Sequence, residues 1–351
     1  MQFGTLAPTN LTSDETVVLF PSLGHLEADG RTWRVLVHGE VFSPPDRVSL
    51  GKRILLKLLQ RARKATPEDL QSDIFRQRIE RFLAVDRAGK KIALRIGHDL
   101  HILPKKTKGN GHFQATLRIS SAEIAELRRA GAYEEGILTL GASLPEGGTC
   151  ISGAVHLLPR EGVSVISDID DTLKHTHVLS RQALLSNTFL RDFEPIPGMA
   201  TLFREWSGQG AAFHYVSSSP WQLYRTLASL FETEGFPEGS FHLLAFRLRD
   251  HLMRRILLMR RSGKGAVIKS ILQMFPERRF VLVGDSGEAD PEIYAGIAQK
   301  FPRQVARVFI REVAGPKNSE KRFMKAFRKI PRRLAMTFKE PEELEGAISG
   351  V

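Results

Sequence analysis

The sequence VSVISDIDDT, at residues 163–172, places three carboxylates and a hydroxyl directly after a short β-branched run. On an extended chain Asp168 and Asp170 project to the same side, because side chains alternate with period two. Carboxylates gathered at the end of a buried strand repel one another, which is costly unless a cation or a charged substrate group neutralises them. The pattern therefore indicates either a site that shares Mg²⁺ and a phosphate or, for this motif taken alone, a solvated acidic turn.

Polar side chains also follow the later strands that the sequence predicts. From Val163 onward short apolar runs alternate with amphipathic segments, which is typical of a parallel sheet with helices on both faces. We expect strands at 163–167, 211–216, 241–246, 279–284 and 306–312, and helices at 198–208, 220–234, 264–275 and 291–300. Ligands of such sheets bind beyond the carboxyl ends of the strands. We therefore expect one site formed by Asp168, Asp170, Thr172, Ser217, Asp285 and Asp290, which follow strand ends, and by Lys264, which begins a helix.

These residue types permit phosphoryl transfer. An aspartate can attack phosphorus and form an aspartyl-phosphate, which divides hydrolysis into two easier steps. Mg²⁺ prefers hard oxygen ligands and lets an anionic carboxylate approach an anionic phosphate. A hydroxyl and an ammonium can hold the remaining phosphate oxygens, and a second carboxylic acid can supply and remove the proton.

Four motifs in this order resemble the signature of the haloacid dehalogenase superfamily of phosphatases: DIDDT, the strand-end serine, the lysine and GDSGEAD. A narrower resemblance is to the actin-patch-protein type of phosphatidate phosphatase. It rests on DIDDTLKHT, NTF, PIPGMATLFREW, HYVSSSPWQLY, FPERRFVLVGDSGEADPEIY and VFIREV. The resemblance implies a haloacid-dehalogenase-like Rossmannoid domain over residues 161–351, preceded by a less distinctive domain. It also implies Mg²⁺-dependent hydrolysis of phosphatidate to diacylglycerol and phosphate.

The resemblance further implies a role for each carboxylate. Asp168 is the expected nucleophile, and Asp170 is the expected general acid/base, with its backbone carbonyl reaching Mg²⁺. The metal is then held by Asp168, Asp170, Asp285 and Asp290. Asp171 occupies a variable position of the motif, and we interpret it as structural.

The phosphate is expected to be bound by Thr172, Ser217 and Lys264, with Thr172 also shaping the motif turn. The family usually has a His-Lys pair where this chain has Gly263-Lys264. Ser219 precedes Pro220 and stands three residues before a glutamine, a pattern that favours a helix cap over a phosphate ligand. Asp290 precedes a proline as well, so it could cap its helix and serve the metal together.

The first half of the chain indicates a different kind of domain. After a flexible lead-in at 1–14, residues 15–160 predict a β-rich domain, compatible with a sandwich, with a helical insertion at 49–85. The expected strands lie within TVVLFPSLG, TWRVLVHGEVF, KKIALRIG, HFQATLRIS and GILTLGA, and SAEIAELRRA predicts a capped helix. His98, Asp99 and His101 are close in sequence, but one short loop offers poor metal geometry, so we interpret them as a polar turn.

Bulk properties limit the class of protein. A chain of 351 residues favours two domains, and its formal net charge of +12 favours anionic partners without selecting one. The single Cys150 cannot form an internal disulfide, which fits a reducing compartment. The sequence shows neither a signal peptide nor an apolar run of about 20 residues. We therefore expect a cytoplasmic protein whose contact with a membrane is peripheral.

The intervals between the motifs leave no room for a large lid, so we expect an open site suited to a bulky or surface-embedded substrate. Two basic tracts could dock on an anionic membrane. For FRLRDHLMRRILLMRRSGK the alternative is a buried connection between a strand and a helix; for KNSEKRFMKAFRKIPRRL the alternatives are nucleic-acid binding and a solvated face. We favour phosphatidate or a related lipid phosphate as substrate and do not favour nucleic acid. The alternatives are a nucleic-acid end or a phosphoprotein as substrate, and a module that only binds.

Overall fold

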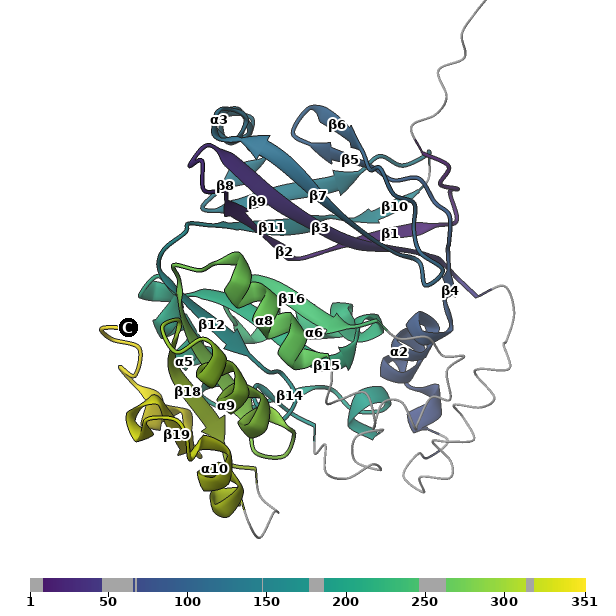
Figure 1. The fold of residues 1–351 in the computed structure, drawn as a ribbon. Coiled ribbons are helices and arrows are strands. Elements are labelled where there is room, and N and C mark those ends of the chain that lie inside the picture. The colour runs from purple at the N-terminus through teal and green to yellow at the C-terminus, as the bar shows by residue number, and fades with distance from the viewer. Residues whose placement is uncertain are drawn as a thin grey trace, which may run out of the picture. The chain divides into compact units, whose positions relative to one another are not determined.

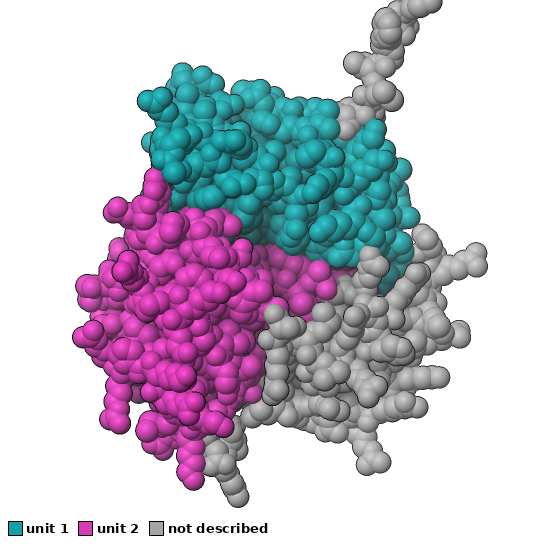
Figure 2. Space-filling model, viewed as in Figure 1, with its two compact units in different colours: residues 1–48, 83–159 teal, residues 49–82, 160–351 magenta. Residues whose placement is uncertain are grey.

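The structure is a computed structural model that describes residues 9–45, 66, 68–146, 148–176, 186–245, 263–313 and 319–351. The chain divides into two compact units, one of residues 1–48 and 83–159 and the other of residues 49–82 and 160–351 (Figure 2). The expected helix KRILLKLLQRAR and the first basic tract up to residue 262 lie outside the described residues. None of the described helices is long and apolar enough to cross a bilayer.

The first unit is built on strands, as predicted (Figure 1). Its strands are β1 (Thr16–Phe20), β2 (Ser22–Leu26), β3 (Thr32–Ser43), β4 (Val85–Asp86), β5 (Ala93–Ile96), β6 (Asp99–Ile102), β7 (His112–Ser120), β8 (Tyr133–Glu134), β9 (Ile137–Ala142), β10 (Thr149–Ile151) and β11 (Gly153–Leu158). The long β3 organises them, because it pairs with β1 and β2 and also, over nine residue pairs, with β7. The order of the remaining strands continues as β2-β11-β9-β5-β6.

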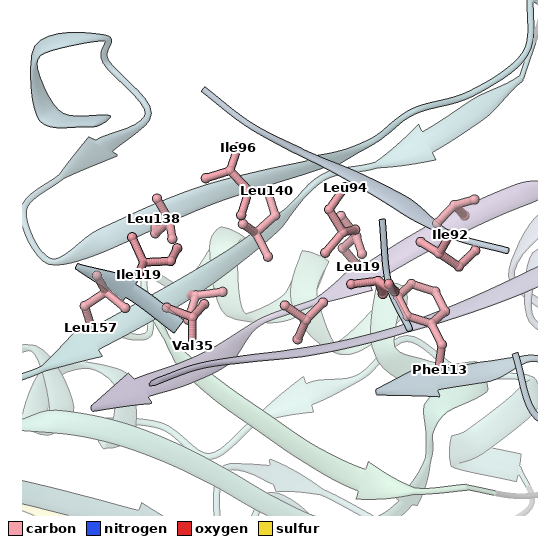
Figure 3. Close-up of a cluster of buried hydrophobic side chains, with 14 of the residues drawn as sticks. Leu19, Val35, Ile92, Leu94, Ile96, Phe113, Ile119, Leu138, Leu140 and Leu157 are labelled. Carbon is pink, nitrogen blue, oxygen red and sulfur yellow. The ribbon is translucent and has the colours of Figure 1, made fainter. Parts of the chain in front are cut away.

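A cluster of aliphatic side chains forms the core of this unit (Figure 3). Leu94, Leu138 and Leu140 come from β5 and β9, while Val35 and Phe113 come from β3 and β7, and none is more than 2% exposed. Each such side chain contributes about 1.5–3 kcal/mol when it is fully buried. The alternating strands predicted from the sequence therefore point their apolar residues into one shared core.

Two segments of this unit differ from the expectation. The residues before the second unit, predicted only as a connection, form β10 and β11, and β11 buries Gly153, Val155 and Leu157 in an alternating pattern. The GHDLH segment is a turn only at its start, because β6 begins at Asp99 and pairs with β5. The helix α3 (Ser121–Arg129) is capped by a serine, but by Ser120, one residue before the serine expected from SAEIAELRRA, through reciprocal bonds between Ser120 and Glu123.

The helix α2 (Asp73–Leu83) groups with the second unit, whereas the sequence placed it in a domain spanning 15–160. Its buried face carries three apolar side chains and one cation, Arg78. The Arg78 Nη1 atom donates to the carbonyls of Asn187, Thr188 and Arg191 at 3.2, 2.9 and 2.6 Å. The guanidinium also lies 4.3 Å from the ring centroid of Phe193. The insertion is thus tied to backbone that belongs to the second unit.

The second unit contains a parallel sheet in the order β16-β15-β12-β17-β18-β19. The strands are β12 (Val163–Ser167), β15 (Ala212–Pro220), β16 (Gly239–Leu244), β17 (Arg279–Asp285), β18 (Val305–Arg311) and β19 (Ala335–Phe338). The helices are α5 (Met199–Gly208), α6 (Tyr224–Glu234), α8 (Lys264–Met274), α9 (Asp290–Lys300) and α10 (Ser319–Phe327), and β13 (Lys174–His175) pairs with β14 (Glu194–Pro195). The five expected strands and four expected helices are confirmed, although a 3₁₀ turn, η2 (Trp221–Leu223), precedes α6.

Numbered by their position in the sequence, these six strands lie in the order 3-2-1-4-5-6, which is that of a doubly wound sheet. The chain builds outward from β12 in one direction and then, from β17, in the other. Ligands of such sheets bind at this reversal, outside the carboxyl ends of the two central strands. The topology therefore directs attention to the residues that follow β12 and β17.

The contacts of Arg78 predict its contribution to stability. We expect Arg78→Ala to lower the free energy of unfolding by about 2–4 kcal/mol, because it leaves buried carbonyls without their charged donor. Arg76→Ala on the same helix is the matched control. Arg76 is exposed and pairs with Asp73 at the surface, so we expect less than about 0.5 kcal/mol. Equal losses for the two variants in chemical denaturation would contradict the assigned role of α2.

Candidate active site

The two strands at the reversal of the sheet bring two aspartates to one edge. β12 pairs with β17 in register from Val163 to Ser167, and the Asp168 N–H continues the pairing by donating to the Val283 carbonyl at 2.9 Å. Asp285 is the last residue of β17. Both aspartates therefore stand where a doubly wound sheet binds its ligand.

Asp290, the first residue of α9, completes a cluster of three carboxylates. One oxygen of each of Asp168, Asp285 and Asp290 lies within 4.8 Å of the others, and all three residues are 0% exposed. No other group of this kind was found in the part of the chain that the structure describes, so His98, Asp99 and His101 form no such cluster. The strand-end carboxylates predicted from the sequence do come together.

Two oxygens of this cluster have no hydrogen bond among the described residues, Asp168 Oδ1, which pairs with Lys264, and Asp285 Oδ2, for which the described residues supply no ion pair either. Asp285 Oδ1 accepts from the N–H groups of Gly287 and Glu288 at 2.6 and 3.0 Å, whereas its buried Oδ2 has no hydrogen-bond partner within the described ranges. A buried carboxylate oxygen is costly to leave without a donor or a cation. Three hard oxygen donors around such an atom fit Mg²⁺, which needs only a few carboxylates because it keeps several waters.

Lys264 lies in the cluster as well. Its Nζ is 2.8 Å from Asp168 Oδ1 and 2.5 Å from Asp290 Oδ1, and the residue is 5% exposed at the first position of α8. One ammonium against three carboxylates leaves two negative charges unbalanced when all are ionised. This is the charge that one divalent cation supplies.

The pKa shifts of these residues are consistent with this excess of negative charge. Burial raises the pKa of Asp168 well above its usual range, against the opposing effect of Lys264 and with a further increase from Asp290. Burial likewise raises the pKa of Asp285, again with a further increase from Asp290. Burial alone would lower the pKa of Lys264, but the carboxylates of Asp168 and Asp290 raise it well above the ordinary value. The lysine therefore stays charged, and the carboxylates require a cation to stay charged beside one another.

Asp170 belongs to a second, separate network. Its Oδ1 accepts from Lys174 Nζ at 2.7 Å and from the Thr176 hydroxyl at 2.9 Å. Its Oδ2 accepts from the hydroxyls of Ser217 and Ser219 at 2.7 and 2.8 Å. Burial would raise the pKa of Asp170, but these donors, Lys174 foremost, hold it below the ordinary value. Asp170 is thus an ionised carboxylate saturated with donors.

The sequence did not single out Lys174 or Thr176. Lys174 follows Asp170 by four residues, yet the chain between them is a turn, and nothing in that spacing shows where its ammonium points. The turn is set by Asp171, which has a left-handed backbone with φ of 56° and accepts the Thr176 N–H at 2.7 Å. Asp171 is therefore structural, as predicted.

The two expected caps are wrong. Ser219 donates its hydroxyl to Asp170, and the residue that caps η2 is Pro220, which offers no side-chain hydrogen bond. Asp290 lies inside α9 after Ala289, so its carboxylate is free to reach Lys264 and the Asp285 N–H at 3.3 Å. In both cases the side chain that the local sequence predicted to cap a helix instead forms a hydrogen bond with a buried charged residue, Asp170 or Lys264.

The remaining predicted phosphate ligands lie beside these networks. Thr172 is buried, and its hydroxyl is 3.4 Å from Asp168 Oδ2. The Ser217 hydroxyl accepts the Ser219 N–H at 2.9 Å while it donates to Asp170. The structure thus places every site residue predicted from the sequence at this edge of the sheet. Asp170 and Ser217 lie in one network, and the carboxylates of Asp168, Asp285 and Asp290 lie in the other.

The loop after Asp285 is held from outside by Arg322 of α10. The Arg322 guanidinium donates to the carbonyls of Ser286, at 2.7 Å, and Glu288, and it pairs with Glu292 at 2.5 Å. The sequence grouped Arg322 with a basic tract and did not connect it with the site. Its contacts help to keep the Gly287 and Glu288 N–H groups directed at Asp285.

Known proteins resemble the part of the chain that carries this site. Residues 163–312 match the family model described as phosphatidate phosphatase APP1, catalytic domain. Phosphatidate phosphatase APP1 of Saccharomyces cerevisiae is 36% identical over 154 residues, which are 43% of this chain and 26% of that protein. The uncharacterized protein C29B5.04c of Schizosaccharomyces pombe is 35% identical over 163 residues, 45% of this chain and 26% of that protein.

This chain thus matches about a quarter of the length of each of these two relatives. Residues 163–312 are similar to the catalytic domain of the actin-patch-protein type of phosphatidate phosphatase, so the resemblance expected from the motifs is confirmed. The chain therefore carries an enzyme domain of the phosphatase class.

Gly284 explains how Asp290 comes so close to Asp285. A Cβ atom at residue 284 would lie 2.2 Å from Asp290 Oδ2 and 2.8 Å from the Tyr294 ring. We expect Gly284→Ala to displace Asp290 and to lower phosphatase turnover by at least about 100-fold, because misplaced catalytic groups are that costly. Gly296→Ala, at an exposed position of α9 with open space around it, is the control. It should keep wild-type turnover and gain up to about 1 kcal/mol of stability. Wild-type turnover in Gly284→Ala would contradict the geometry.

The pairing of Asp170 with Lys174 can be tested by a double-mutant cycle. We expect Lys174→Met to lower the free energy of unfolding by about 3–5 kcal/mol, because it leaves a buried carboxylate without its cation. Lys174→Met combined with Asp170→Asn should recover part of that loss, since the stranded charge is removed. Additive losses in the double variant would show that the two residues are not coupled.

Proposed function

We propose that this chain is a Mg²⁺-dependent, haloacid-dehalogenase-type phosphatase that hydrolyses phosphatidate or a related lipid phosphate through an aspartyl-phosphate. The main observation in favour of this function is the cluster of three buried carboxylates, Asp168, Asp285 and Asp290, which lies with Lys264 at the point where the strand order of a doubly wound sheet reverses. The similarity of residues 163–312 to a phosphatidate phosphatase catalytic domain, and to phosphatidate phosphatase APP1 of Saccharomyces cerevisiae, supports phosphatidate as the substrate.

The chain's own residues account for most of the proposed chemistry. A bound Mg²⁺ would supply positive charge between the nucleophile and the phosphate, and Asp168, Asp285 and Asp290 would hold it with the Asp170 carbonyl. Asp168 attacks phosphorus, and the bond between phosphorus and the lipid oxygen breaks as the aspartyl-phosphate forms, so that the alcohol leaves. Lys264, beside Asp168, offsets negative charge in this step. Water then cleaves that intermediate, which regenerates the Asp168 carboxylate and releases phosphate.

Asp170 is the proposed general acid/base: it first takes a proton from solvent, gives that proton to the oxygen of the leaving alcohol, and then removes a proton from the attacking water. In the structure its four hydrogen-bond donors occupy both oxygens. Ser217 has one hydroxyl proton, so donation to a substrate phosphate requires that it release Asp170 Oδ2. Substrate binding by Ser217 therefore removes one of the two donors from Asp170 Oδ2 in this proposal, while Ser219 continues to donate to that oxygen.

The nucleophile and the metal are tested together. We expect Asp168→Asn to lower phosphate release from phosphatidate in mixed micelles by at least about 1,000-fold, because the attacking oxygen is lost. EDTA should abolish wild-type turnover, and added Mg²⁺ should restore it. Asp73→Asn, on the exposed start of α2, is the control and should behave as wild type. Turnover by Asp168→Asn at the wild-type rate would remove the mechanism.

The substrate class needs its own comparison. Phosphatidate in mixed micelles would be assayed beside 5′-phosphorylated oligonucleotides and phosphopeptides under the same Mg²⁺ concentration. The proposal expects the highest kcat/KM for the lipid. Equal or faster hydrolysis of either soluble substrate would replace phosphatidate with that class and leave the phosphatase mechanism intact. We also propose that the enzyme meets its substrate by peripheral contact with an anionic membrane.

A further inference from the structure

The helix α10 presents an exposed stripe of cations around one apolar side chain. Lys321, Met324 and Lys325 lie on α10, and Arg328 directly follows its last residue, Phe327. The four positions follow the spacing of one helical face, and all four are exposed. The Met324 side chain is 57% exposed, unlike the buried or half-buried methionines that fill cores. We call these four residues the α10 stripe.

The orientation of α10 is set by contacts on its other sides. The rings of Phe323 and Phe327 are in contact in a tilted arrangement with centroids 4.6 Å apart, and Phe327 is only 7% exposed. Arg322 is bound to the backbone of the loop that follows Asp285. Figure 1 shows α10 beside α9, and the two helices pack together. The stripe is therefore the outward face of a helix anchored to the active-site loop.

The charge of this face continues along the chain. Residues 321–339 contain eight basic and no acidic residues, and after the stripe Lys329, Arg332 and Arg333 are exposed together with Met336 at 39%. The nearest acidic neighbours in sequence are Glu320 and Glu340, one at each end. Cations interleaved with exposed methionines suit a surface that is both anionic and apolar just below its charges.

From these contacts we propose that the α10 stripe docks the enzyme on an anionic phospholipid bilayer, a role that rests on the proposed action on a lipid phosphate. The cations bind headgroup phosphates while Met324 enters the headgroup–acyl boundary. Because α10 also holds the loop after Asp285, docking through this stripe keeps the strand-end site close to the membrane.

Nucleic acid is the competing anionic partner, and the exposed side chains argue against it. Proteins that bind single strands add aromatic side chains on which bases stack. In α10 the aromatic residues Phe323 and Phe327 are not exposed, and the exposed apolar residue is Met324. A bilayer uses flexible aliphatic side chains without stacking.

Vesicle binding tests this proposal with the full chain. Phosphatidylcholine vesicles are compared with vesicles that also contain phosphatidylserine, which is anionic but is not the proposed substrate. Wild type should bind only the anionic vesicles, and more weakly as salt rises. Since each cation strengthens binding about fivefold, Lys321→Glu/Lys325→Glu/Arg328→Glu should weaken it by at least about 100-fold. The matched control is Lys105→Glu/Lys106→Glu/Lys108→Glu, an equal charge change on exposed lysines of the first unit, which should keep most of the binding.

The outcomes separate docking from catalysis. Unchanged binding by the α10 variant, or equal losses in both variants, would overturn the docking role. Tighter binding of a single-stranded oligonucleotide than of anionic vesicles, lost in the α10 variant, would assign the stripe to nucleic acid instead. The α10 variant should hydrolyse phosphatidate in uncharged detergent micelles within about twofold of wild type. Should no variant hydrolyse that substrate while vesicle binding follows the expectation, the proposed function fails and the docking surface stands.

A variant with a smaller change in charge distinguishes loss of vesicle binding from unfolding of the protein. Lys321→Gln/Lys325→Gln removes two charges without reversing them, and both residues are exposed. It should weaken vesicle binding about 25-fold while its far-UV circular dichroism matches wild type. A folded Lys321→Gln/Lys325→Gln variant with wild-type vesicle affinity would also overturn the proposal.

Discussion

The second unit depends on a set of like charges buried at the point where its sheet reverses direction. Three carboxylates meet there with a single ammonium, that of Lys264, and Asp285 Oδ2 has no hydrogen-bond partner among the described residues. Such an arrangement lowers the stability of the protein, because neither burial nor the like charges favour ionisation. The absence of a side chain at Gly284 lets Asp290 approach, while Arg322 holds the loop whose N–H groups bind Asp285. These features hold three carboxylates beside one ammonium, which leaves an excess of negative charge that a divalent cation would balance.

Beside this cluster, the chain builds a second charge centre that is already balanced. Lys174 neutralises Asp170, and its ammonium also lies 4.4 Å from the Phe193 ring centroid. Arg78 of α2 contacts the same ring at 4.3 Å and binds the backbone just before it. A helix from the N-terminal half thus supports the residue proposed to move the proton. The two charge centres have different proposed roles. The cluster of three carboxylates would bind a cation, whereas the donors around Asp170 keep that carboxylate ionised until Ser217 binds the substrate phosphate instead.

Much of the second unit could be predicted from the sequence, because its two central strands, β12 and β17, are apolar runs rich in valine and isoleucine that end in polar residues. The positions of Asp168, Lys264 and Asp285 followed from that pattern together with the strand-end rule for parallel sheets. The short β19 was missed because AMTF is weakly β-branched and follows a basic helical tract. Ser219 was misread because its local pattern is that of a cap, while its real partner, Asp170, is 49 residues away. Lys174 and Arg322 were missed for the same reason, since their contacts depend on turns and loops that spacing does not describe.

The central claim is that the buried carboxylates form a cation site that the folded protein tolerates at a cost in stability. Chemical denaturation of wild type and Asp285→Asn, with and without Mg²⁺, tests this claim directly. Without metal, the asparagine variant should be the more stable protein, because it loses an unbalanced charge yet can still accept the two loop N–H bonds. Mg²⁺ at about 100 times its Kd should stabilise wild type by about 2.7 kcal/mol and leave the variant unchanged. A wild-type stability that does not respond to Mg²⁺, or an equal response in both proteins, would contradict the account.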